Sequence, residues 1–190
     1  MQCINKTSQV EELIKKSRFI SFITPCQTES EVKCFLQGLY EPYQGASHIA
    51  FAYRLKTEKG IVCRFSDAGE PSGTAGKPIF KYLEGYDLIN TLIVVVRYFG
   101  GVKLGAGGLT RAYGNAAKLA ITEATLVDFI EQATLKFELD YKQLQLFEYQ
   151  LPKFSGIILS KEFVANIKIV VQLPEQQADD FLQLFMGQRI

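Results

Sequence analysis

Two segments rich in glycine and charge hold the residues best suited to chemistry. Residues 67–78 (DAGEPSGTAGKP) and 97–114 (RYFGGVKLGAGGLTRAYG) contain nine of the fifteen glycines in the chain. Glycine costs about 0.5–1 kcal/mol more backbone entropy than alanine, so such a cluster indicates positive φ angles or a backbone that closely approaches a ligand. The glycines expected at this surface are Gly73, Gly76, Gly100, Gly101, Gly105, Gly107 and Gly108.

Four cations lie among these glycines and would suit phosphate groups. They are Lys77, Arg97, Lys103 and Arg111. Glycine-rich turns that lead into helices near residues 74 and 108 would add unpaired N–H groups, which attract anions. We therefore predict an anion-binding or nucleic-acid-binding surface, while tight turns that close a small sheet explain the glycines equally well.

Neither segment matches a standard nucleotide-binding loop. The P-loop pattern needs glycine where Pro71 stands, and Ser or Thr where Pro78 follows Lys77. In residues 105–110 (GAGGLT), Thr110 takes the place of the last glycine of the dinucleotide motif G-x-G-x-x-G. The sequence therefore supports neither a P-loop nor a dinucleotide fold.

His48, Asp67 and Glu70 are the candidates for acid–base catalysis. His48 is the only histidine in the chain, so any histidine-dependent step would need it. The two carboxylates could also bind a metal, but no second acidic cluster completes a magnesium site. Their alternative role is to pair with the cations of residues 97–114. Because an uncompensated buried charge is costly, we expect at least one carboxylate–cation pair between the two segments.

Aromatic side chains flank the basic positions. Tyr98, Phe99 and Tyr113 are near Arg97 and Arg111 in the sequence. Aromatic rings beside such cations can stack on nucleotide bases, whereas Phe99 could equally continue the buried strand that precedes it.

Periodicity and capping signals predict the elements of residues 1–125. Strands are expected at residues 17–25, 47–55, 61–66 and 92–96. The last of these contains the apolar run LIVVV, which favours a central strand covered on both faces. Helices are expected after a capping box formed by Thr28 and Glu31, over residues 74–86, and after the second glycine segment.

The pattern restarts after residue 130. A strand at 135–139 precedes a second capping box, Asp140 with Gln143, and a helix that Pro152 stops. Strands at 156–160 and 167–173 and a helix that starts at Pro174 follow. This β-α-β-β-α series is a ferredoxin-like unit without its last strand. We predict an α+β protein with two domains, residues 1–125 and 126–190.

Composition and charge exclude several classes of protein. The net charge of +1 divides into 15 basic against 11 acidic residues over 1–125, a net of +4, and 6 against 9 over 126–190, a net of −3. That excess is far below the charge of a dedicated DNA-binding domain. The four cysteines show no C-x-x-C spacing, which argues against a structural zinc site. With no signal peptide and no membrane span, we expect a cytoplasmic protein.

The glycine segments, with ASHIAFAYR (46–54) upstream, resemble the signature segments of the YigZ/IMPACT family. The resemblance is specific over roughly residues 17–120 and looser beyond them. It implies an N-terminal α/β sandwich similar to domain IV of elongation factor G and a ferredoxin-like domain similar to domain V. One departure is Ala68, which stands where the acidic turn of the family usually has a second aspartate.

The resemblance also implies a role in translation. Eukaryotic members regulate translation by competing for the activator of a starvation-responsive initiation-factor kinase. For this bacterial-type chain we expect a non-enzymatic regulator that binds RNA, the ribosome or a translation-associated protein, without a cofactor. One alternative is a hydrolase of a phosphorylated or nucleotide substrate that uses His48, Asp67 and Glu70. The other is a pure protein-interaction module.

Overall fold

A computed structural model of the protein describes residues 1–185. The chain divides into two compact units, Met1–Phe129 and Ile130–Ile190. Each unit has its own apolar core, so each is described by itself. The α+β class expected from the sequence is confirmed.

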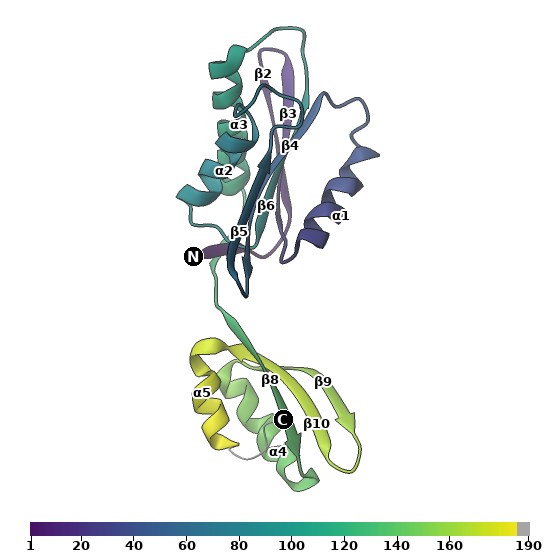
Figure 1. Cartoon of the computed structure of the whole chain (residues 1–190), viewed down its shortest axis with the longest axis vertical. Coiled ribbons are helices and arrows are strands. Elements are labelled where there is room, and N and C mark those ends of the chain that lie inside the picture. Colours follow the sequence, from purple (N-terminus) through teal and green to yellow (C-terminus); the bar gives the residue numbers. More distant parts are fainter. Residues whose placement is uncertain (186–190) are drawn as a thin grey trace. The chain divides into compact units, whose positions relative to one another are not determined.

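A five-stranded antiparallel sheet forms the centre of the N-terminal unit (Figure 1). Its order is β2-β3-β6-β4-β5, and every neighbouring pair is antiparallel. The strands in this order are Ser8–Ile14, Ser17–Pro25, Thr91–Tyr98, His48–Thr57 and Gly60–Ser66. Every residue of β6 from Thr91 to Arg97 is buried, which confirms the central strand predicted from its apolar run.

Helices cover both faces of this sheet. Helix α1 (Glu29–Tyr40) lies on one face, and α2 (Gly76–Gly85) and α3 (Gly105–Thr122) lie side by side on the other (Figure 1). Alternate residues of β3 and β6 therefore enter two different cores: Ile23 and Val95 face α2 and α3, whereas Phe22 and Val94 face α1. The sheet is thus the middle of three layers, with helices on both of its faces.

The beginnings of the helices follow from local signals. Thr28 Oγ1 accepts from Glu31 N at 3.2 Å, as predicted, but Glu31 Oε2 accepts at 2.8 Å from Gln27 N, one residue before the N-cap, and not from Thr28 N as a capping box requires. Helix α3 begins earlier than expected, at Gly105, and not near residue 108. Gly107 and Gly108 are therefore in the first turn of α3 rather than in a loop.

Strand β2 was not predicted. Its half-buried face carries the polar residues Ser8 and Glu12 as well as Val10 and Ile14, which obscures the alternation of apolar and polar residues that is typical of a strand.

The pairing of two short strands was not predicted either. Strand β1 (Gln2–Ile4) pairs with β7 (Leu126–Asp128). This pairing places residues 126–128, which the sequence analysis assigned to the second domain, in the N-terminal unit.

The C-terminal unit has a three-stranded antiparallel sheet in the order β8-β10-β9. Its elements are β8 (Gln132–Leu139), α4 (Tyr141–Gln150), a 3-10 helix (Leu151–Phe154), β9 (Ile157–Phe163), β10 (Ile167–Pro174) and α5 (Glu175–Leu184). Asp140 and Gln143 form the predicted capping box. Phe137, Phe147 and Phe181 are fully buried and pack edge to face. The order and the antiparallel pairing of these strands are those of a ferredoxin-like βαββα unit.

We predict that limited proteolysis cuts first between residues 129 and 131, which belong to no helix or strand, and releases a stable N-terminal fragment. Mass spectrometry of the fragments checks this. Primary cleavage within residues 90–120 would contradict the division, because that stretch contains β6 and α3 of the N-terminal core.

Candidate functional site

Asp67 holds the turn that leads into α2. Its Oδ2 accepts from Gly73 N at 2.8 Å, and its Oδ1 accepts from Ala75 N at 2.9 Å and from Gly76 N at 2.8 Å. Burial raises the pKa of the Asp67 carboxyl, but the three N–H donors outweigh burial and bring the pKa below its usual value. The carboxylate therefore stabilises the backbone of this turn, and both of its oxygens already accept hydrogen bonds from backbone N–H groups.

Glu70 and Arg97 form a buried ion pair between the two glycine segments. Their side chains are 3% and 5% exposed, and Arg97 Nη1 lies 2.5 Å from Glu70 Oε1. Tyr113 donates its hydroxyl to the same oxygen at 2.9 Å. Burial, and then the negative charge of Glu70, raises the pKa of Tyr113, so the tyrosine keeps the proton that it donates. The expected carboxylate–cation pair between the segments is confirmed.

The surroundings of Arg97 fix it in the interior. Its guanidinium lies over the rings of Phe19 and Phe99, at 5.4 and 5.6 Å from the ring centroids. Arg97 Nη2 donates to Ser17 Oγ at 3.4 Å, and this hydroxyl also accepts from Gly100 N at 3.2 Å. Because the charge of this buried guanidinium is already paired with Glu70, we leave Arg97 out of the proposed phosphate contacts.

His48 joins this cluster from the beginning of β4. Its Nδ1 lies 2.9 Å from the carbonyl oxygen of Ala68, and its Nε2 lies 3.8 Å from Glu70 Oε1. A carbonyl oxygen only accepts, so Nδ1 carries a proton and Nε2 is directed toward Glu70. Of the three acid–base candidates, His48 and Glu70 therefore lie together, whereas Asp67 is bonded to the backbone of the next turn.

A pocket of about 300 Å³ opens beside Glu70, and we call it the Glu70 pocket. His48, Arg97, Phe99 and Lys103 contribute to its lining. Apolar residues supply most of the remaining wall, namely Pro71, Leu104, Ala106 and Leu109, together with Gly105.

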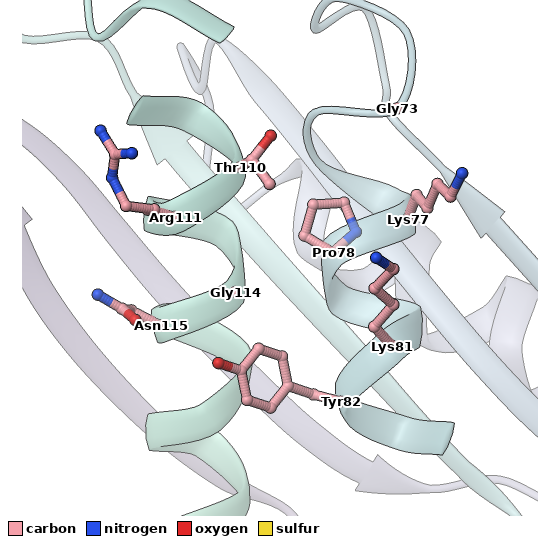
Figure 2. A pocket seen from close by; sticks show the side chains of 9 residues that line it. All are labelled: Gly73, Lys77, Pro78, Lys81, Tyr82, Thr110, Arg111, Gly114 and Asn115. Carbon is pink, nitrogen blue, oxygen red and sulfur yellow. The ribbon is translucent and has the colours of Figure 1, made fainter. Parts of the chain in front are cut away.

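A second pocket, the basic pocket, lies between α2 and α3 and has a volume of about 450 Å³ (Figure 2). Lys77 and Lys81 lie on α2 and Arg111 lies on α3, and in Figure 2 the Arg111 side chain extends from the side of α3 away from α2. Thr110 and Asn115 add a hydroxyl and an amide, and the described lining residues include no carboxylate. No protein anion thus neutralises the three cations within this lining.

The predicted site residues are divided between these two pockets and the packing around them. Gly73, Lys77 and Arg111 line the basic pocket, and Lys103 and Gly105 line the Glu70 pocket. Two glycines permit close backbone contact: a Cβ on Gly76 would lie 2.7 Å from the Ser66 backbone, and one on Gly100 would lie 1.9 Å from Lys16 O. Gly101 is an exposed turn residue with positive φ, and Gly107 and Gly108 lie in the first turn of α3.

Sequence reasoning missed Lys81 as a site residue. Lys81 follows Lys77 by four residues, a spacing that places two side chains on the same face of a helix. That spacing was the signal that could have identified it. Over residues 1–185, no group of three or more His, Cys, Asp or Glu is placed to hold a metal, and no helix is long and apolar enough to cross a membrane.

We predict that Asp67→Ala lowers the free energy of unfolding at pH 7 by about 1–2 kcal/mol, because the N–H groups at the beginning of α2 lose their acceptor. Since folding lowers the pKa of Asp67, this contribution is present above about pH 4 and is lost as the pH falls through the folded-state pKa. Urea titrations of both proteins between pH 2.5 and 7 measure the difference.

Asp67→Asn is the matched control, because its amide oxygen still accepts a hydrogen bond, and it should lose less stability than Asp67→Ala. A difference between wild type and Asp67→Ala that stays constant from pH 7 to 2.5 would show that the carboxylate does not stabilise the turn.

Comparison with known proteins identifies both units. The Impact N-terminal domain matches residues 15–121, and a domain of unknown function (DUF1949) matches residues 137–185. An IMPACT family member of Haemophilus influenzae is 37% identical over 172 residues, covering 90% of this chain and 84% of the relative. YigZ of Escherichia coli is 33% identical over 173 residues, covering 90% and 85%. A crystal structure of a hypothetical protein superposes with a TM-score of 0.74 at 31% identity, over 97% of this chain and 90% of that one. The chain belongs to the IMPACT family.

Proposed function

We propose that this protein is a non-enzymatic regulator associated with translation, and that it binds single-stranded or ribosomal RNA through the basic pocket. The observation that carries the proposal is the arrangement of Lys77, Lys81 and Arg111 around one pocket whose described lining has no carboxylate. Cations that line one pocket without a counter-charge in its lining attract anions, and a polyanion can contact several of them at once.

The chemistry of the pocket suits a phosphate backbone. The two lysines of α2 act as point charges, and the guanidinium of Arg111 on α3 offers paired N–H donors. The Thr110 hydroxyl and the Asn115 amide add neutral donors of the kind that contact phosphate and sugar. These groups recognise the backbone and not the base sequence.

Lys103 is a fourth candidate contact and lies just before the N-terminus of α3. It precedes α3 by two residues and is exposed. Together with the three cations of the basic pocket it gives four phosphate contacts, with Lys81 in the place that the sequence analysis gave to Arg97.

A regulatory role fits the chemistry of the carboxylates better than a hydrolytic one. Asp67 already accepts three backbone hydrogen bonds, and Glu70 Oε1 is bonded to Arg97 and Tyr113. The link to translation rests on the IMPACT family, whose eukaryotic members are expected to regulate translation. The RNA ligand rests on the basic pocket.

A protein partner is the second candidate, and one observation favours it. Strand β9 is an edge strand of the C-terminal sheet, and Ile157, Leu159 and Phe163 are 56%, 51% and 59% exposed along it. Exposed apolar side chains on an edge strand are typical of a surface that pairs with another chain.

We predict that the affinity for a single-stranded RNA falls steeply with salt. Four phosphate contacts at roughly −0.7 each give a slope of log affinity against log salt of about −3. Lys77→Ala, Lys81→Ala and Arg111→Ala should each make the slope shallower by about 0.7, because each removes one contact. Fluorescence anisotropy between 25 and 200 mM salt measures these slopes.

Lys59→Ala is the matched control, because Lys59 lies in the turn between β4 and β5 and lines neither pocket. It should leave the slope unchanged. If no RNA binds at the lowest salt, or if the three variants keep the wild-type slope, the RNA ligand is wrong and the protein partner becomes the leading function.

A further inference from the structure

One carboxylate oxygen of Glu70, Oε2, receives no hydrogen bond from the described residues at the Glu70 pocket. The contacts of Glu70 with Arg97, Tyr113 and His48 all involve Oε1. In the described part of the chain, no residue donates a hydrogen bond to Oε2, although the side chain is only 3% exposed and lines the pocket. Oε2 is not among the enclosed side-chain atoms, so this acceptor is accessible to a ligand that carries an N–H or O–H group.

His48 supplies a second acceptor next to that oxygen. Its Nδ1 proton is donated to the Ala68 carbonyl, so in the neutral imidazole Nε2 holds a lone pair. Nε2 lies 3.8 Å from Glu70 Oε1, and both residues line the pocket. Two neighbouring acceptors match an amino group, which has two N–H bonds to donate.

The rest of the pocket suits a flat, apolar body attached to an anion. Phe99, 48% exposed, and the side chains of Leu104 and Leu109 form much of its wall. Unstacked bases bind proteins by stacking on such rings. Lys103 adds a cation to the lining. The volume of about 300 Å³ is at the lower end of the range for small-molecule sites, about 300–1,000 Å³.

We propose that the Glu70 pocket binds one unstacked nucleobase that carries an exocyclic amino group, with the amino group between Glu70 and His48 and the base against Phe99. For its cellular ligand this rests on the RNA binding proposed above, whereas mononucleotides alone test its chemistry. Cytosine and uracil are a matched pair. Where cytosine has its 4-amino group, uracil has a carbonyl oxygen, an acceptor that would face two acceptors.

The test is a titration of the full chain with cytidine 5′-monophosphate and with uridine 5′-monophosphate, followed by the amide NMR shifts of Gly69, Glu70 and Phe99. We expect saturable shifts with the cytidine nucleotide and an affinity at least about 10-fold higher than for the uridine nucleotide. Equal affinities, or no saturable shift at these residues with either nucleotide, would overturn the proposal.

Two variants identify the groups responsible. Glu70→Gln presents a donor as well as an acceptor, so the preference for cytidine over uridine should fall toward one. Because this change also removes the counter-charge of Arg97, Phe99→Ala provides an independent test: it should weaken both nucleotides by a similar factor of about 10. Phe65→Ala, an aromatic of similar exposure (47%) that does not line the pocket, should change neither affinity.

RNA homopolymers separate failure of this pocket from failure of the proposed function. If poly(C) and poly(U) bind equally and with the steep salt slope, the base pocket is overturned and the RNA function stands. If cytidine monophosphate binds selectively but neither homopolymer binds at low salt, the pocket stands and the RNA function is overturned.

Discussion

The ion pair between Glu70 and Arg97 is the interaction on which the rest of the N-terminal unit depends. Both side chains are almost fully buried, and removing two charges from water is costly unless their geometry and hydrogen bonds are nearly complete. Tyr113 donates to Glu70 Oε1, while Ser17 and two aromatic rings surround Arg97. In this way one pair fixes β3, β6, α3 and the turn at residues 67–75 relative to one another. Loss of either partner would leave a buried charge without compensation.

This arrangement separates the structural charges from those available to a ligand. Asp67 is used by the beginning of α2, and Arg97 is used by Glu70. Lys77 and Arg111 extend from the outer surfaces of helices whose inner surfaces are fixed by that interior network. The same two charge-rich segments therefore supply both the buried network and the basic pocket. Different residues do each task, although the buried and the exposed ones alternate in the sequence.

Most elements could be predicted because their signals are local. The apolar run before Arg97 identified β6, and the capping signals in the sequence at Thr28 and Asp140 identified two helices. The burial of Arg97 could not be predicted by counting charges. It continues the buried strand, and its partner Glu70 lies 27 residues earlier in the sequence. Strand β2 was missed for a related reason, since its half-buried face includes Glu12, a residue that sequence patterns place in solvent.

The close approach of Gly100 to the backbone of Lys16 makes the tight turn between β2 and β3 part of the site. Lys15 and Lys16 both have positive φ, as a two-residue hairpin requires, and Ser17 directly follows them. Ser17 Oγ accepts from both Gly100 and Arg97. The position of this turn therefore determines where the Ser17 hydroxyl lies relative to the Arg97 guanidinium. A change in the length of that surface hairpin would therefore move Arg97 and change the shape of the Glu70 pocket, although neither Lys15 nor Lys16 lines the pocket. The position of Arg97 at the pocket therefore depends on a hairpin next to Ser17, which lies 80 residues earlier in the sequence.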